Sequence, residues 1–410
     1  MDQVHKEVDR LYKEHFGKMV ASLLYSSRDI DLEIAEDIVQ DSFSAALKDW
    51  QVNGVPLHAA GWLYKVCKHK ALNKIRKDKR IEGISEKTNI ASVEIKFAES
   101  VLEDQQLKLL FDCAHPDLAP KTQVVITLKY VVNLKVEAIA KILGMSIDGV
   151  DKLLLRARQK IKDEKILLEE PVASALESRL SIVHKILYLI FNEGYKSSWG
   201  KEIVREELCE EALIMTKGLI DVRLGNKETS ALYALMLFNS ARFKSRFGPS
   251  GELLPLEKQN RSLWNSELIL LATDFLLQSR DENLSSYHLE ASLAFIHCKA
   301  KSFETTDWKT IRKLYEQLLH DNPNPFIELN YSIALYYAGE KDRAFGILMT
   351  LHRHPVLHQY YLLNATLGKL HQLEGNDSAA KQYLLQAYEQ TGFKIEKEFI
   401  QKMIDELKVG

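Results

Sequence analysis

The sequence predicts an all-α protein of more than one domain, and three observations lead to this fold class. Apolar residues recur at three- and four-residue steps along most of the chain, which is the period of an amphipathic helix. Within the first eighty residues no alternating strand pattern competes with that period. The length of 410 residues exceeds what one hydrophobic core usually holds, so we expect two or three domains.

Composition and charge narrow the class of protein. Apolar residues make up 46% of the chain. The net charge of -2 is small, but the charges are unevenly distributed, with an acidic stretch over 29–41 and a basic stretch after Gly61. The four cysteines are far apart, which argues against a disulfide framework and a thiolate zinc site. The N-terminus lacks the apolar core of a signal peptide, and no apolar run is long enough to span a bilayer. We therefore expect a soluble, cytoplasmic protein.

A basic amphipathic helix is predicted over residues 61–80, after a loop over 51–60 that contains Gly54 and Pro56. An apolar stripe on one side repeats at four-residue steps, at Leu63, Cys67, Ala71 and Ile75. The opposite face is cationic and polar, which favours a polyanionic partner. Its members are Lys65, Lys68, His69, Asn73, Arg76, Lys77 and Arg80. A solvated charged surface is the alternative for this stretch taken alone.

A linker and a helix-turn-helix follow. Residues 81–104 show weak periodicity and many small polar residues, as in a linker. Residues 136–143 predict a short helix, and Gly144 after it predicts a left-handed turn. Ser146 is placed to cap a second helix over 147–162. An ordinary αα-hairpin gives the same signal. The β-branched run 124–132 (VVITLKYVV) could pass for a strand, but its place before this motif favours a helix.

Helical patterns continue from residue 169 to the end, and the last hundred residues contain a repeat. Gly339 and Gly375 stand 36 residues apart, as do Ala344 and Ala380. A glycine turn followed by a helix with a small residue resembles a tetratricopeptide unit, whose period is about 34 residues. We expect such repeats near 305–410, with an irregular helical bundle as the alternative.

Two groups of motifs resemble bacterial sigma factors of the extracytoplasmic-function class. The string AEDIVQDSFSAALKDW, with the loop and basic helix after it, resembles region 2. HPDLAPKTQVVITLKYVVNL, IAKILGMS and LLLRARQKIKDE resemble region 4. The resemblance implies region 2 at 1–80, a linker at 81–104, region 4 at 105–168 and a fused helical domain at 169–410.

The same resemblance implies the partners and their contact residues. Asp37, Gln40 and Asp41 would face core RNA polymerase, while Phe43 and Trp50 pack inside. The loop and basic helix would recognise and melt the minus-ten promoter element, using a cationic groove and a pocket for an unstacked base. The second helix of region 4 would enter the major groove of the minus-thirty-five element.

Several positions depart from the residues usual in this class. His69 and Asn73 do so in region 2, and Gly149, Asp151 and Leu153 do so in the recognition helix. The promoter sequence therefore cannot be inferred from relatives, and we expect weak or unusual binding at the minus-thirty-five element. The DNA-binding set of region 4 would mostly contact phosphate, and it comprises Ser146, Lys152, Arg156, Arg158 and Lys160.

No group of side chains points to catalysis, a metal or a cofactor. His352, His354 and His358 could suggest a metal site, but Pro355 interrupts any helix between them and no carboxylate or thiolate completes the set. A loop between repeats is the better interpretation. We expect a non-enzymatic protein whose partners are core RNA polymerase, promoter DNA and a protein or peptide ligand of the C-terminal domain, with no membrane partner.

Two other functions stay open. An autonomous helix-turn-helix regulator with a repeat-type sensor domain would bind its operator without polymerase. An interaction scaffold would leave the basic helix without a role. The connection between Lys165 and Leu176 is short and apolar, so we expect the C-terminal domain to pack on region 4 and to support activity.

Overall fold

The computed structural model describes residues 3–27, 29–81, 95, 97, 99–164, 166, 173–196, 205–249 and 251–407. Within these ranges, the side chains of 78–81, 99–104 and 173–177 are not described. Every extended regular element in the described part of the chain is a helix, and its one β-bridge joins Phe247 to Leu253. The predicted all-α fold class is confirmed.

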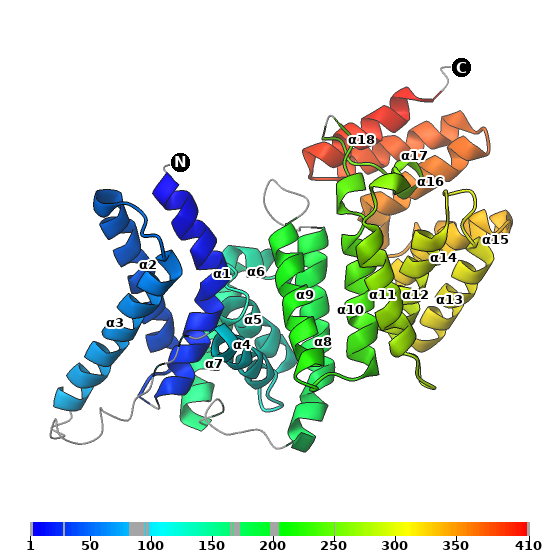
Figure 1. Ribbon diagram of the computed structural model, residues 1–410. Helices are drawn as coiled ribbons and strands as arrows, with labels where there is room; N and C mark the ends of the chain where they lie inside the picture. The colour runs from blue at the N-terminus through cyan, green and yellow to red at the C-terminus, as the bar shows by residue number, and fades with distance from the viewer. Residues whose placement is uncertain are drawn as a thin grey trace. The chain divides into compact units, whose positions relative to one another are not determined.

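Contacts divide the chain into two compact units, residues 1–225 and 226–410 (Figure 1). The helices of the first unit are α1 (Gln3–Ser26), α2 (Leu32–Asn53), α3 (Ala59–Ile81), α4 (Glu99–Cys113), α5 (Pro120–Tyr130), α6 (Val136–Ile142), α7 (Ile147–Glu164), α8 (Ala173–Tyr195) and α9 (Glu206–Asp221). Those of the second unit are α10 (Lys227–Ser240), η2 (Phe243–Ser245), η3 (Leu256–Lys258), η4 (Arg261–Leu263), α11 (Ser266–Gln278), α12 (Ser286–Lys299), α13 (Trp308–Asp321), α14 (Pro325–Tyr337), α15 (Lys341–Leu351), η5 (Leu357–Gln359), α16 (Tyr361–Leu373), α17 (Asp377–Gln390) and α18 (Lys394–Asp405).

The first predicted loop is shorter than expected, because α2 runs to Asn53 and α3 begins at Ala59. Gly54 ends α2 with a φ of 78°, a left-handed value that glycine adopts without strain, and its N–H donates to the carbonyl of Trp50. The predicted linker over 81–104 is also shorter than expected, since α3 includes Ile81 and α4 starts at Glu99. Its middle, residues 82–94, lies outside the described residues.

Helix α1 packs directly against the end of α5, which joins the predicted regions 2 and 4 within one unit. Gly17 is the point of closest approach, because a Cβ added there would lie 2.3 Å from the carbonyl oxygen of Val131. Nearby, Asn133 Nδ2 donates to the carbonyl of Tyr12 at 3.4 Å. A glycine in the middle of a helix costs stability, so the close helix contact accounts for its presence.

Helices α8 and α9 pack on α4, although the sequence assigns them to the C-terminal domain. Asp112, which is fully buried on α4, accepts a hydrogen bond from the Tyr25 hydroxyl at 2.5 Å and lies 3.4 Å from Arg179 Nη1 of α8. Gln106 Nε2 of α4 donates to Glu211 Oε1 of α9 at 2.8 Å. The division of contacts therefore falls after Gly225 rather than near residue 169.

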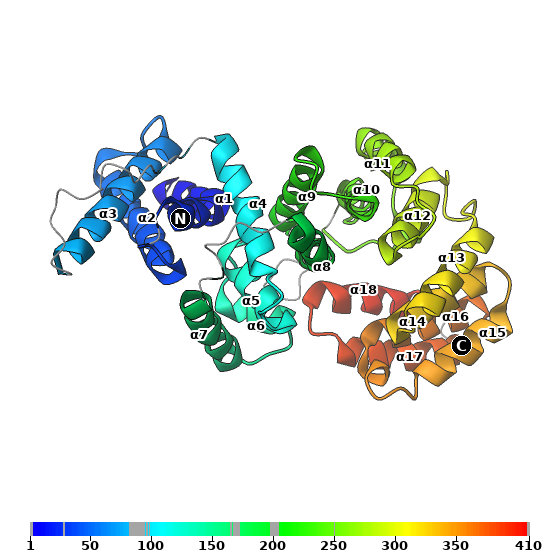
Figure 2. The same ribbon diagram turned by 90° about the horizontal axis from the view of Figure 1, so that it is seen from below.

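The second unit contains two similar helix pairs, α14–α15 and α16–α17, which lie together in Figure 2. Gly339 and Gly375 form the turns with φ values of 96° and 75°, as left-handed turns require. Ala344 and Ala380 are fully buried at the following helices. The repeated glycine and alanine positions are thus structurally equivalent.

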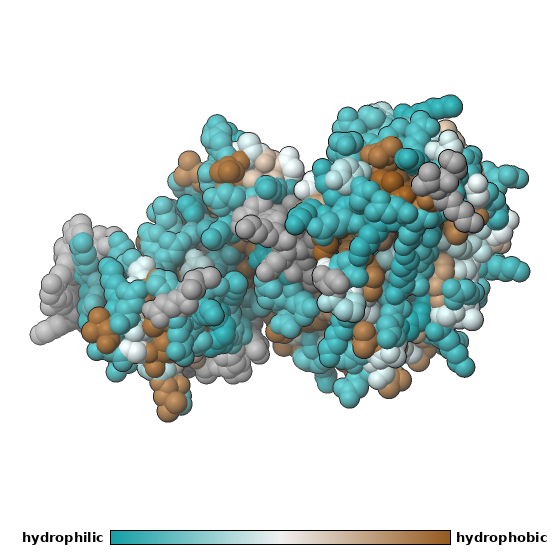
Figure 3. Space-filling view, turned by 90° about the horizontal axis from the view of Figure 1, so that it is seen from above, coloured by the Kyte–Doolittle hydropathy of each residue, from teal (hydrophilic) through white to brown (hydrophobic). Residues whose placement is uncertain are grey.

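No described helix combines the length and the apolar character that crossing a membrane would need. The face in Figure 3 is mainly hydrophilic, with its apolar residues gathered in separate small patches.

Candidate functional site

The exposed side of α2 carries the predicted polymerase-facing residues. Asp37, Gln40 and Asp41 are all exposed, and they follow one another at helical spacing. Phe43 and Trp50 point the other way and are buried, with exposures of 4% and 1%. Burial from water and the neighbouring carboxylates raise the pKa of Asp37. The arrangement is an acidic, solvent-facing ridge on a helix whose other side is fixed in the core.

Helix α3 separates its apolar and cationic sides as the sequence predicts. Leu63, Cys67, Ala71 and Ile75 are buried, each at most 1% exposed. The exposed positions comprise Lys65, His69, Asn73, Arg76 and Lys77, and Lys68 is half-buried. The side chain of Arg80 lies outside the described residues. Among the described residues, no carboxylate pairs with Lys65, Arg76 or Lys77, so this cationic face is available to a polyanion.

The predicted helix-turn-helix is present as α6, a four-residue turn over 143–146 and α7. Gly144 has a φ of 59°, and the N–H of Met145 donates to the carbonyl of Ala140 at 2.7 Å, which closes the end of α6. Ser146 Oγ accepts from the N–H of Gly149 at 3.1 Å and caps α7. The left-handed glycine and the serine cap are confirmed.

The exposed side of α7 has a weaker cationic character than α3. Lys152 is exposed but pairs with Asp148 one turn earlier at 2.7 Å. Asp151 and Arg156 are also exposed, and the negative charge of the first offsets the positive charge of the second. Leu155 lies between them with an exposure of 66%. This surface can bind phosphate through Lys152 and Arg156, but it carries little net positive charge.

Arg158 lies on the inner side of α7, where it bonds to the rest of the first unit. Its Nη2 lies 2.9 Å from Glu36 Oε2 on α2, and its Nε donates to the Tyr130 hydroxyl at 2.5 Å. Glu36 Oε1 also pairs with Lys129 Nζ of α5 at 2.7 Å. Only 8% of the Glu36 side chain is exposed, so a nearly buried carboxylate joins α2, α5 and α7.

Two further contacts fix the end of α7. Lys160 Nζ donates to the carbonyl of Asp117 at 2.6 Å, and Lys162 Nζ lies 3.2 Å from Asp31 Oδ2 at the start of α2. In this conformation Arg158 and Lys160, two of the predicted phosphate-binding side chains, are therefore occupied by contacts within the protein.

Sequence reasoning missed Glu36, Lys129 and Tyr130 as members of this cluster. Glu36 lies beside the acidic residues already identified, and Lys129 and Tyr130 are polar positions in an otherwise apolar run. Neither signal reveals the pairing, because Arg158 and Glu36 are 122 residues apart in the chain.

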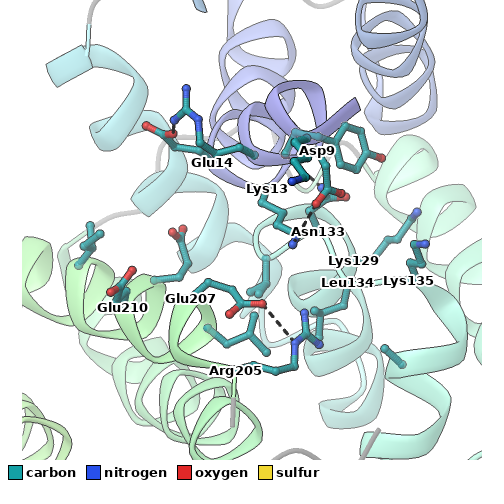
Figure 4. Close-up of a pocket in the computed structure, with 18 residues that line it drawn as sticks. Asp9, Lys13, Glu14, Lys129, Asn133, Leu134, Lys135, Arg205, Glu207 and Glu210 are labelled. Carbon is teal, nitrogen blue, oxygen red and sulfur yellow. Dashed lines mark hydrogen bonds and ion pairs between the residues drawn. The ribbon is translucent and has the colours of Figure 1, made fainter. Parts of the chain in front are cut away.

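A large cleft of about 1050 Å³ lies beside this cluster, between α1, the α5–α6 turn and the start of α9 (Figure 4). Lys13 pairs with Asp9 at 3.1 Å, and Arg205 Nε lies 3.5 Å from Glu207 Oε1. Lys129 and Lys135 also line the cleft, as do Glu14, Glu210 and Glu211. Charges of both signs alternate on its walls, so the cleft does not concentrate charge of one sign.

Two family models match separate parts of the chain. The model of sigma-70 region 4 matches residues 108–161, which contain the end of α4, all of α5 and α6, and most of α7. A model described as a family of unknown function (DUF6596) matches residues 179–280. No solved structure matches the chain.

Three proteins of known sequence are similar to this chain. It is 30% identical over 313 residues to the uncharacterized protein R00370 of Rhizobium meliloti strain 1021, covering 74% of each chain. It is 28% identical to RNA polymerase sigma factor SigV of Bacillus subtilis strain 168, over 36% of this chain and 81% of that protein. It is 27% identical to RNA polymerase sigma factor YlaC of the same strain, over 38% of this chain and 90% of that protein.

Proposed function

We propose that this chain, which belongs to the same family as the uncharacterized protein R00370 of Rhizobium meliloti, is an alternative sigma factor of the extracytoplasmic-function class. It binds core RNA polymerase in the cytoplasm and directs promoter recognition, promoter melting and transcription initiation. The observation that carries the proposal is the helix-turn-helix of α6 and α7 inside the sigma-70 region 4 match. The polymerase supplies the chemistry, and this chain supplies binding.

Polymerase binding is assigned to the acidic ridge of α2, formed by Asp37, Gln40 and Asp41. These side chains project into solvent from a helix whose opposite side is buried, so they meet a partner without any change in the core. Acidic residues on such a rigid support fit a basic surface on the polymerase.

DNA binding at the minus-ten element is assigned to the cationic face of α3. The test is replacement of Arg76, Lys77 and Arg80 by Ala in the full chain, followed by promoter-complex formation across salt concentrations. Each phosphate contact releases counterions, so we expect the logarithmic salt slope to fall by about 2 to 3. An unchanged slope would remove the assignment.

We further propose that the first unit opens when both promoter elements are bound. Centres about 25 base pairs apart correspond to roughly 85 Å of duplex at about 3.4 Å per base pair. The ion pairs of 2.7 Å and 2.9 Å at Glu36 hold α5 and α7 against α2, whose 22 residues span only about 33 Å. In the proposed open state these pairs are broken and Arg158 is exposed to DNA phosphate.

The second unit is proposed to be a tetratricopeptide-like module that supports the activity and takes a protein or peptide ligand. The two equivalent helix pairs with left-handed Gly339 and Gly375 support this assignment. Because α8 and α9 pack on α4, the segment between region 4 and the module also contributes to the first unit.

A gel shift with and without core polymerase tests the proposal against an autonomous helix-turn-helix regulator. The DNA targets are fragments selected from the protein's own genome by incubation with the chain and core polymerase together. A sigma factor retards them efficiently only when core polymerase is present and starts transcripts from them. An equal shift by the chain alone, with no transcripts, would favour the autonomous regulator instead.

A further inference from the structure

We propose that the second unit contains a binding site for a small, uncharged aromatic molecule, in the cavity bordered by Phe303, Trp308 and Tyr337. This inference is independent of the sigma-factor proposal, because it rests on the lining of one cavity in the second unit.

The cavity has a volume of about 400 Å³. Its walls come from η3, α12, α13, α14, α16 and α18, together with the segment between α12 and α13. The cavity is partly open to solvent, so a small molecule can enter it. Small-molecule sites typically measure about 300 to 1000 Å³ and are mainly apolar, as this lining is.

Aromatic rings form one wall of the cavity. The rings of Trp308 and Tyr337 stack with their centroids 4.8 Å apart and their planes at 26°. Phe303 meets both rings edge-on, at 5.0 Å from Trp308 and 4.9 Å from Tyr337. Phe399 and Met403 of α18 add further apolar surface. Flat, polarisable rings of this kind attract an aromatic guest through stacked and edge contacts.

The charged groups of the lining are already paired. Glu257 Oε1 lies 3.0 Å from Lys369 Nζ, and Glu406 Oε1 lies 3.0 Å from Lys258 Nζ. A charged guest would lose its hydration without gaining a free counterion, which is costly in an apolar site. The pairing therefore favours an uncharged molecule.

His297 adds an uncharged ring to the lining. It lines the cavity, and its ring packs edge-on against Trp308 with the centroids 5.5 Å apart. Burial and the nearby Arg242 and Arg261 lower its pKa to about 4, so the imidazole is neutral at physiological pH. Its Nδ1 is buried and has no hydrogen-bond partner among the described residues.

An extended peptide is the competing occupant, and the lining suits it less well. A peptide brings a polar backbone whose N–H and C=O groups need partners at each residue. Besides His297 and the paired charges, the side chains that could provide them are Asn330, Thr366, two tyrosine hydroxyls and the indole N–H of Trp308, which are too few for every peptide group of an extended chain. One compact aromatic molecule uses the available surface better.

Titration of the full chain with two matched fluorescent probes tests the proposal. N-phenyl-1-naphthylamine is uncharged, and 1-anilinonaphthalene-8-sulfonate has the same ring system with one added negative charge. We expect saturable binding of the uncharged probe, at least about tenfold tighter than binding of the sulfonate. Absence of saturable binding, or equal affinity for the two probes, would overturn the proposal.

Thr366→Trp locates the bound probe, because Thr366 lines the cavity from α16 and a larger side chain fills the space. Leu373→Trp is the matched control, since Leu373 lies near the end of the same helix, is 47% exposed and does not line the cavity. The uncharged probe should bind the first variant at least about tenfold more weakly and the control as tightly as the original chain. Equal binding to both variants would place the probe elsewhere and overturn the assignment.

A second measurement remains decisive if Thr366→Trp fails to fold. Energy transfer from tryptophan to the bound uncharged probe should drop in Trp308→Phe, because Trp308 lies in the cavity wall. It should stay unchanged in Trp50→Phe, because Trp50 belongs to the first unit. Equal transfer in Trp308→Phe and the original chain would contradict binding at this site.

Discussion

Replacing Gly17 by Ala tests whether α1 and α5 pack as closely as the first unit requires. The added Cβ would lie 2.3 Å from the carbonyl oxygen of Val131, whereas ordinary contacts begin at 3.4 Å, so the two backbones must separate by about 1.1 Å. Forcing extra volume into a packed contact costs about 1 to 3 kcal/mol, and an overlap with backbone atoms, which cannot rotate away, belongs at the upper end, about 2 to 3 kcal/mol. Alanine returns up to about 1 kcal/mol through its higher helix propensity, so we expect a net loss of about 1 to 2 kcal/mol.

Amide hydrogen exchange followed by mass spectrometry reports this loss locally, in peptides covering 11–26 and 120–134. A cost of about 1 to 2 kcal/mol lowers protection there roughly 5- to 30-fold. Gly61→Ala is the matched control, because the nearest atom to its added Cβ is 3.9 Å away and Gly61 is exposed on α3. The control should keep or slightly raise protection. Equal or greater protection in Gly17→Ala would refute the close packing of α1 on α5.

Three further outcomes are expected. Glu36→Gln should lower the stability of the first unit by about 1 to 3 kcal/mol in urea unfolding, because Lys129 and Arg158 lose the carboxylate that they share. The control Glu33→Gln changes an exposed residue and should alter stability by less than about 0.5 kcal/mol. Equal effects of the two substitutions would contradict the stabilising role of the Glu36 cluster. Burial raises the pKa of Asp112 to about 6, above its unfolded value, so its contribution to stability should fall by up to about 3 kcal/mol as pH rises from 4 to 6. The stability difference between the original chain and Asp112→Asn should decrease over that range. A constant or increasing difference would contradict the raised pKa of Asp112. A chain ending at Gly225 should stay soluble and unfold cooperatively. A chain ending at residue 170 should melt several degrees lower, because it lacks the contacts of α8 and α9 with α4. Equal melting temperatures of the two chains would be inconsistent with those contacts.

The sequence predicted those features that depend on local spacing. The buried stripe of α3 follows from apolar residues at four-residue steps, and the turn at Gly144 with its Ser146 cap follows from residue types with known backbone preferences. The strand-like run before the turn is the helix α5, as its position in the motif indicated. Local chemistry determines each of these features, so one sequence is enough to find them.

Contacts between distant segments could not be predicted in this way. Glu36 reads as another exposed acidic residue of α2, yet it is nearly buried because Lys129 and Arg158 reach it from α5 and α7. Gly17 reads as a weak point in a helix, and only the nearby end of α5 explains it. The inclusion of α8 and α9 in the first unit likewise depends on Asp112 and Glu211 finding partners on other helices. Such pairings are set by packing in three dimensions and leave no periodic signal in the chain.

The affinity of the full chain for core RNA polymerase tests the central proposal most directly. Reversing the charge at Asp37 and Asp41 to Lys changes two exposed residues of the α2 ridge, and the control reverses Asp163 and Glu164, two exposed residues at the end of α7. Both variants change the net charge equally, and their circular dichroism should match that of the original chain. We expect the α2 variant to bind core polymerase at least about tenfold more weakly and the control to bind within about twofold of the original chain. Undiminished binding by a folded α2 variant, or no binding by the original chain, would contradict the proposed interface.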